Sequence, residues 1–411
     1  MSKSLVFLAF KMAWSNLWRR VRRSVLVIMM IAGSMTAMLA IEGLYDGMVK
    51  TMRESTLRSD SGEVSVYGPK FRLYQSLDYA MTDVRPLQTA VAADPRVRAS
   101  VVRIEQTGLA STARKSSMAR LVGIDLEAEE RFGKLSAFVT DGNITWGSRL
   151  NGCAIGKQLA KDMGVEIGHR LVFSSQNAQG DISSLSLRVT AIIQTSNLTI
   201  DNQTIFITLP RSRAFAGLGA FGATQVAMRV QTAAETDAVA ASLKAQFTGL
   251  DVETWKALYP VLVQMQDMMV IFNSITFAIV MLVVLIGIFG VVLVSILERT
   301  REFGILIALG TPQAQLRLQV VIEALVLGIL GFLAGAASSY AALWYLVHFG
   351  LDLREYAAGL EAFGYNAVVF ADIKLRYFTN TFFAIVAAAL ASVVLPMYRL
   401  KKLNPIEVIQ E

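Results

Sequence analysis

Residues whose types could support catalysis are few in this 411-residue chain, and their spacing does not favour an enzyme. The histidines His169 and His348 have no Cys or His neighbour at metal-ligand spacing, so no zinc site is expected. The segment 142–149 has the glycine spacing of a phosphate-binding loop but lacks the lysine after the second glycine, and we interpret it as a turn followed by a strand. The single cysteine, Cys153, cannot form an intrachain disulfide, and we expect it to be a small buried apolar residue.

An acidic cluster of Asp125, Glu127, Glu129 and Glu130 could supply a pair of catalytic carboxylates. Acidic residues also favour the first turn of a helix, where they interact with the helix dipole, and this is the interpretation that we adopt. We therefore expect a protein that is not itself an enzyme.

Long runs without a charged residue indicate an integral membrane protein. Charged residues make up 17% of the chain, whereas soluble proteins carry about 25%. Since about 20 apolar residues cross a bilayer, the sequence predicts four transmembrane helices, at residues 22–45, 266–297, 317–347 and 377–399. The second run, Met268–Leu297, is longer than a bilayer requires, so this helix either tilts or continues into the segment before it.

The net charge of +7 indicates orientation rather than nucleic-acid binding. Residues 45–267 carry 24 basic and 22 acidic residues, a balance that does not indicate a basic DNA-binding face. Residues 1–23, 298–317 and 399–411 together carry twelve basic residues, as is typical of the cytoplasmic side of a membrane. We therefore expect both termini in the cytoplasm and the 223 residues of the segment 45–267 outside.

The long segment between the first two predicted spans has the pattern of a mixed α/β domain. Period-two apolar spacing with β-branched residues predicts strands at residues 63–67, 98–104, 184–190, 203–208 and 225–230. Helical spacing predicts helices at residues 154–163 and 232–247. Because strands and helices are interspersed, we expect a large mixed α/β domain between helices one and two.

A short apolar segment after the second predicted span carries the most specific motif of the chain. Glu298, Arg299, Arg301 and Glu302 form a mixed-charge turn, and the apolar residues 303–309 are too few to cross a membrane. Such a helix suits either the bilayer interface or a groove on a soluble partner. We call residues 298–316 the elbow. The elbow is either a contact surface through which a partner moves a span or a turn at the bilayer interface that leads the chain back into the membrane.

The third predicted span contains one ionisable residue, Glu323, and three glycines spaced for close helix packing, Gly328, Gly331 and Gly335. An ionisable group within a span is a candidate functional residue. Glu323 lies near the cytoplasmic end, within reach of the interface or of Arg317, so we expect a structural or coupling role rather than a proton relay. The glycines should lie at a helix–helix contact, within the chain or between two copies.

These motifs resemble the permease subunits of ABC transporters of the MacB/FtsX/LolC-LolE superfamily. The run Glu298–Gly310 is similar to that family's E-R-x-x-E-[FI]-G-[IV]-L-x-A-L-G signature, and Arg399–Val408 to its basic tail with P-x-E-[AV]. Trp14–Arg23 resembles its basic entry helix, and Gly152–Gly168 resembles a recurrent segment of its external domain. The resemblance covers essentially the whole chain.

The resemblance implies three regions and one ATPase-coupling surface. The regions are an entry helix with the first span (1–45), a MacB-type periplasmic domain (46–265) and an FtsX-like permease domain with the elbow and tail (266–411). The residues implied in coupling are Glu298, Arg299, Arg301, Glu302, Phe303, Gly304, Leu309, Gly310, Pro405 and Glu407. The implied partners are a separate cytoplasmic ABC ATPase dimer, a second permease copy or paralogue, and membrane lipid. No cofactor is expected on this chain, since ATP and Mg would bind the ATPase.

The resemblance also implies a location in the bacterial inner membrane and a function in mechanical coupling. The expected cargo is a lipoprotein or another amphiphile taken from the outer leaflet, because Glu63–Tyr67 follows the first span as in lipoprotein-releasing relatives. One alternative is MacB-like efflux of drugs, peptides or toxins with an outer-membrane partner. Another is FtsX-like mechanical signalling to a periplasmic partner.

Overall fold

The computed structural model of the chain describes residues 21–144, 151–195, 197–356 and 368–401. Residues 14–20 of the predicted entry helix and the tail residues Pro405 and Glu407 lie outside these ranges. The described residues form two compact units. A helical unit takes its residues from 1–48, 266–352 and 368–411, and an α/β unit takes its residues from 49–265 and 353–367.

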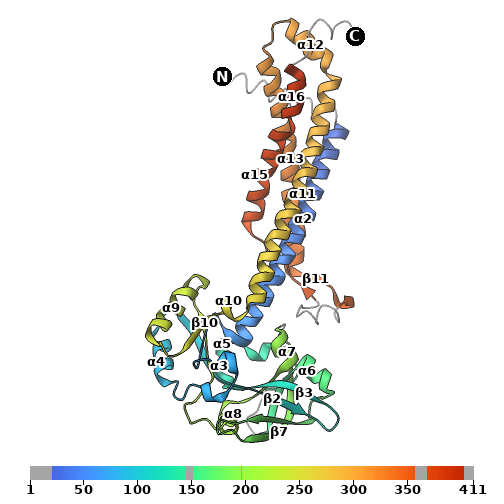
Figure 1. The fold of residues 1–411 in the computed structure, drawn as a ribbon. Helices are drawn as coiled ribbons and strands as arrows, with labels where there is room; N and C mark the ends of the chain where they lie inside the picture. The colour runs from blue at the N-terminus through green and yellow to red at the C-terminus, as the bar shows by residue number, and fades with distance from the viewer. Residues whose placement is uncertain (1–20, 145–150, 196, 357–367, 402–411) are drawn as a thin grey trace. The chain divides into compact units, whose positions relative to one another are not determined.

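The described residues contain four helices that are long and apolar enough to cross a membrane, as the charge-free runs predict (Figure 1). They are α2 (Val21–Thr56), α11 (Pro260–Glu298), α13 (Gln313–His348) and α15 (Leu375–Ser392). The shorter elements of this part of the chain are α12 (Thr300–Ala308), α16 (Val394–Lys401) and the paired strands β11 (Leu351–Asp352) and β12 (Val368–Val369). Within the helical unit the long helices share one apolar core, which includes Ile31, Ile288, Leu343 and Ile385.

Two of the spans belong to helices longer than their apolar runs. Helix α2 continues to Thr56, beyond the predicted end of the first span at residue 45. Helix α11 begins at Pro260, so the second apolar run continues into the preceding segment as one 39-residue helix, which is one of the two predicted alternatives.

The fourth candidate span covers Leu375–Tyr398, close to the predicted 377–399. Within it α15 ends at Ser392, and α16 follows with Pro396 in its first turn, where proline has no backbone N–H to donate. The pair Thr311–Pro312 predicts a cap followed by proline at the first helical position, but Pro312 itself occupies the N-cap position of α13, so this prediction was wrong by one residue.

The α/β unit is built on a mixed ten-stranded sheet of order β10-β1-β9-β2-β3-β8-β5-β7-β4, with β6 beside β2 and β7. The strands are β1 (Val64–Tyr67), β2 (Val97–Ser111), β3 (Ser116–Ile124), β4 (Val139–Gly142), β5 (Gly152–Gly156), β6 (Arg170–Gln176), β7 (Ile182–Ile193), β8 (Thr204–Thr208), β9 (Gln225–Val230) and β10 (Asp251–Thr254). The helices are α3 (Phe71–Tyr74), α4 (Arg85–Ala93), α5 (Leu126–Gly133), α6 (Lys157–Met163), α7 (Leu198–Gln203), α8 (Leu209–Ala216), α9 (Thr236–Gln246) and α10 (Trp255–Leu258). A π-helical turn, η1 (Leu57–Ser61), follows α2.

All five strands predicted from alternation are present, whereas one predicted helix was wrong at its start. Residues Gly152–Gly156 form the buried strand β5 between β7 and β8, and α6 begins only at Lys157. Cys153 and Ile155 are fully buried there, and hydrogen bonding on both edges of the strand outweighs local helix preference.

Strand β2 belongs to both halves of the sheet. Residues Val97–Arg103 pair with β9, and residues Ile104–Ser111 pair with β3. Helices α4 and α9 bury Leu87 and Val239 in a core on the β9 half. Helices α6 and α8 contribute to a separate core on the other half. Strand β2 contributes Ile104 to the first core and Ala110 to the second, and α8 likewise contributes to both, so these two elements join the cores.

Candidate functional site

The elbow places charged side chains on the surface and an aromatic anchor inside. Within α12, Phe303 is 1% exposed and packs into the core of the helical unit, and Gly304 beside it is also buried. Arg301 and Glu302 are exposed, and Leu309, just after the helix, is 79% exposed. The buried Phe303 can hold the helix in place while the exposed residues remain available to a partner.

Arg299 connects the elbow to the interior of the third span. Its Nε donates to Glu302 Oε2 at 2.9 Å, and its guanidinium lies 5.0 Å from the centre of the Phe303 ring. Its Nη1 lies 3.8 Å from Glu323 Oε2. Glu323 is only 8% exposed and also accepts a hydrogen bond from Ser295 Oγ at 3.1 Å. The structure thus places Arg299 beside Glu323, a contact that was not expected from the sequence.

Glu298 and Gly310 mark the two ends of the elbow helix. Glu298, the last residue of α11, accepts two hydrogen bonds of 2.8 Å from Arg23 near the start of α2. Both side chains are more than one-third exposed, so this pair stabilises the fold by at most about 1 kcal/mol. Gly310 has a φ of 89°, a left-handed conformation that suits glycine and turns the chain toward α13.

The three glycines of α13 lie at contacts within the chain. A Cβ on Gly331 would approach the Ile31 side chain to 2.7 Å, and one on Gly335 would approach Met35 Sδ to 2.8 Å. Gly328 instead faces α15, where a Cβ would lie 3.4 Å from Ala389. Glycine therefore permits α2 and α13 to pack more closely than any larger residue would.

A buried ion-pair network in the α/β unit was not expected from the sequence. Arg103 on β2 is 1% exposed and donates to both carboxylate oxygens of Glu129, at 2.6 and 2.8 Å. Its Nη1 also donates to the backbone carbonyl of Asp60. Asp125 caps α5 as predicted, accepting from the backbone N–H of Glu127 at 3.0 Å, but Glu129 is buried rather than solvated.

Asp60 joins the two ends of the α/β unit. It lies on the π-helical turn η1, and its Oδ2 accepts a hydrogen bond of 2.5 Å from the hydroxyl of Tyr259, the residue just before α11. Arg120 on β3 lies 3.4 Å from the same oxygen. Burial, together with the nearby Asp60 carboxylate, raises the pKa of Tyr259 well above its ordinary value, so the hydroxyl remains a donor. The sequence signal for this network is the pair of charged residues, Arg103 and Glu105, on either side of Ile104 and directly after the apolar residues 101–102.

The other candidate groups are explained by packing and turns. Cys153 is fully buried, and burial raises the pKa of its thiol to about 12. His169 accepts a hydrogen bond from the backbone N–H of Glu166 at its Nδ1, 3.1 Å away. Within the described ranges, no group of three or more His, Cys, Asp or Glu side chains is placed to hold a metal ion. Part of the segment 142–149 lies outside those ranges.

Comparisons with known proteins match both parts of the chain. Residues 24–246 match the family model of the MacB-like periplasmic core domain, and residues 274–405 match that of the FtsX-like permease C-terminal region. The chain is 25% identical over 354 residues to the probable syringafactin export ATP-binding/permease protein SyfD of Pseudomonas syringae pv. tomato, covering 81% of this chain and 50% of that protein. It is 37% identical over 76 residues to the macrolide export ATP-binding/permease protein MacB of Hyphomonas neptunium, covering 18% and 12% of the two chains.

Among solved structures, the chain is similar to the periplasmic region of MacB from Actinobacillus actinomycetemcomitans. The identity is 9% and the TM-score 0.35, with 48% of this chain and 91% of that chain covered. The chain spans half or less of the length of the two curated relatives described above.

Proposed function

Because the chain belongs to the MacB/FtsX family of ABC transporter permeases, we propose that it couples cytoplasmic ATP hydrolysis to a conformational change of its periplasmic domain. One observation carries this proposal. The two family matches follow each other along the chain, and the four candidate spans flank the α/β unit in the order that coupling requires. We further propose that the ATPase is a separate subunit and that the permease works as a dimer.

The elbow is the proposed docking surface for the ATPase. Arg301, Glu302 and Leu309 are exposed, whereas Phe303 is buried beneath them. The contact from Arg299 to Glu323 supports a route by which a force on α12 would reach the third span. In this proposal the elbow, the twelve basic flanking residues and both termini face the cytoplasm.

Reversing the charges of the elbow tests this proposal. Charges on the ATPase that complement Arg301 and Glu302 would face charges of their own sign in the Arg301→Glu/Glu302→Arg variant. The amount of ATPase that co-purifies should therefore fall at least tenfold. Asp83→Arg/Arg85→Glu is the matched control, because that pair is also solvent-exposed but lies in the α/β unit. Full recovery of the ATPase with the elbow variant would refute the docking assignment.

For the cargo, we propose a lipoprotein or another amphiphile extracted from the outer leaflet of the inner membrane. The segment Glu63–Tyr67 gives no support, because it forms β1 with every strand residue buried. Exposed apolar side chains on the α/β unit do support an amphiphile, since Leu109 and Met118 pair across β2 and β3 and are 48% and 70% exposed. Purified acylated lipoprotein should stimulate ATP hydrolysis by the reconstituted complex, and an unacylated form should not.

Export of a small molecule is the second candidate, favoured by the names of the relatives. Those names describe export of macrolides and of syringafactin. If a macrolide stimulates ATP hydrolysis and lipoprotein does not, the cargo is an exported small molecule rather than a lipoprotein. Both results leave the proposed coupling to the ATPase intact.

A further inference from the structure

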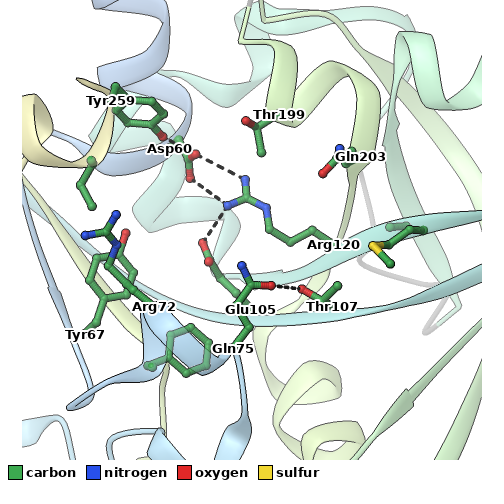
Figure 2. Close-up of a pocket in the computed structure, with 14 residues that line it drawn as sticks. Asp60, Tyr67, Arg72, Gln75, Glu105, Thr107, Arg120, Thr199, Gln203 and Tyr259 are labelled. Atoms are coloured by element: carbon green, nitrogen blue, oxygen red, sulfur yellow. Dashed lines mark hydrogen bonds and ion pairs between the residues drawn. The ribbon is translucent and has the colours of Figure 1, made fainter. Parts of the chain in front are cut away.

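A cavity of about 430 Å³ lies in the α/β unit beside the turn that carries Asp60 (Figure 2). Its volume is in the range of small-molecule sites, which are about 300–1,000 Å³. Three charged side chains, Asp60, Glu105 and Arg120, approach one another on one wall. Apolar side chains also line it, from β1, α3, β3 and α10: Tyr67, Phe71, Met118 and Leu258.

The charged wall contains two carboxylates that share one guanidinium. Arg120 lies 3.4 Å from Asp60 and 3.3 Å from Glu105, longer than the about 2.7–2.9 Å of a strong charge-assisted hydrogen bond. The neighbouring Arg103 is bonded through two nitrogens to Glu129. Burial and the nearby Asp60 carboxylate raise the pKa of Glu105. Arg103 also lies 4.0 Å from Asp60, so three carboxylates, those of Asp60, Glu105 and Glu129, share the two guanidinium groups of Arg103 and Arg120.

A fourth charge, Arg72, lies on another side of the cavity. Its guanidinium lies 5.8 Å from the centre of the Tyr67 ring, and Figure 2 shows the two side chains next to each other. Arg72 is solvent-exposed, and no hydrogen bond or ion pair joins its guanidinium to another of the described residues. It is thus available to an acidic group of a ligand.

An apolar surface continues outward from the cavity. Met118 lines the cavity and is 70% exposed, and its cross-strand partner Leu109 is 48% exposed. Both side chains lie on the same face of the β2–β3 pair, because directly paired residues of antiparallel strands point to the same side. A chain attached to a headgroup in the cavity could lie along this pair.

We propose that this cavity binds the zwitterionic headgroup of an amphiphile, with its ammonium group at Asp60 and Glu105 and its acidic group at Arg72. A phospholipid headgroup and a soluble zwitterion share this chemistry. The inference rests on the proposed function only in taking an amphiphile as the ligand. Its test needs no ATPase, so the failure of either proposal can be recognised separately.

Isothermal titration of the full chain in nanodiscs of phosphatidylglycerol alone measures the binding. The probes are dihexanoylphosphatidylethanolamine, dihexanoylphosphatidylglycerol, which lacks the ammonium group, and glycerophosphoethanolamine, which lacks the chains. Empty nanodiscs give the heat of partitioning into lipid. We expect the ethanolamine lipid to bind at least tenfold more tightly than the glycerol lipid.

Three variants locate the site. Glu105→Gln removes the partner of the ammonium group and Arg72→Gln that of the acidic group, so each should weaken binding of the ethanolamine lipid at least tenfold. Thr199→Trp should block the cavity without removing a charge. The Thr199 backbone N–H bonds to Asn197 and its carbonyl to Thr204, and tryptophan keeps both groups. Glu166→Gln, at an exposed position outside the cavity, is the matched control.

Glycerophosphoethanolamine separates the two sources of the ligand. If it binds as tightly as the lipid, the ligand is a soluble zwitterion; much weaker binding identifies a lipid, and both results support the site. The inference is overturned if the two dihexanoyl lipids bind equally or not at all. It is also overturned if the three variants keep the thermal stability of the wild type together with its affinity.

Discussion

The largely buried carboxyl group of Glu105 destabilises the folded state when it is ionised, and this cost points to a role in binding. Glu105 lies on the long strand β2, its side chain is 13% exposed, and it shares Arg120 with Asp60. Burial and the Asp60 carboxylate raise its pKa above the ordinary value of 4.5, more than the nearby arginines lower it. A carboxylate whose ionised form is disfavoured in the folded protein is typical of a site that serves something other than stability.

This raised pKa predicts a pH-dependent effect of Glu105→Gln. The folded state holds the proton more tightly than the unfolded state, so stability from this group is complete below pH 4.5 and is lost as pH rises through the folded pKa. Glutamine stays neutral, and the variant should therefore gain Tm relative to the wild type at pH 8 but not at pH 4.5. Each pKa unit corresponds to about 1.4 kcal/mol, or to a change in Tm of about 3–6 °C for a domain of 150–250 residues. An equal difference at both pH values would contradict the prediction.

Helix α13 is the element that organises the helical unit. Its glycines allow α2 and α15 to approach, and its Glu323 carries the contact from the elbow into the interior. In a membrane, helices associate through close van der Waals contact rather than through the hydrophobic effect. The positions where a side chain would clash are therefore those on which the bundle depends most.

Replacing a glycine by valine should show whether the glycine is needed for close helix packing or whether any valine in a span lowers stability. In Gly331→Val, the new Cβ would lie within 3.0 Å of Ile31, and such overpacking costs about 1–3 kcal/mol. Gly290→Val in α11 is the matched control, since a Cβ there meets nothing within 4 Å. Thermal unfolding in detergent should show a lower Tm for Gly331→Val alone. A similar loss in both variants would point to a general effect of valine in a span.

At the scale of the whole molecule, the side of the membrane that each unit faces is open to a direct test. The charge distribution predicts a cytoplasmic elbow and an external α/β unit. The chain is well suited to labelling because its one cysteine, Cys153, is fully buried and can be replaced by alanine. Leu309 and Ile182 are 79% and 84% exposed, so a cysteine at either position would be reachable.

Single cysteines in the Cys153→Ala background should report the orientation. A membrane-impermeant maleimide added to intact spheroplasts should label Ile182→Cys and leave Leu309→Cys unlabelled. After the membrane is disrupted, both variants should react to a similar extent. Labelling of Leu309→Cys alone in intact spheroplasts would reverse the proposed orientation.

The sequence was most informative where one physical requirement acts locally. Charge-free runs predicted the four spans, and alternation predicted five strands, because bilayer thickness and half-burial act on neighbouring residues. The start of α6 was missed because β5 depends on neighbours on both sides. The network of Asp60, Arg103 and Glu129 was missed for a similar reason, since its members lie 26 and 43 residues apart and meet only in the folded chain.

Strand β2 has a consequence for how this domain can vary. Its first half pairs with β9 and its second half with β3, and each half of the sheet has its own core. A substitution in β2 must therefore suit two sets of neighbours at once, whereas β10 and β4, at the two ends of the sheet, each pair with a single strand. Among relatives that adapt to new ligands, substitutions should therefore accumulate in the outer strands. The sequence of β2 should change least, while the two halves of the sheet on either side of it diverge separately.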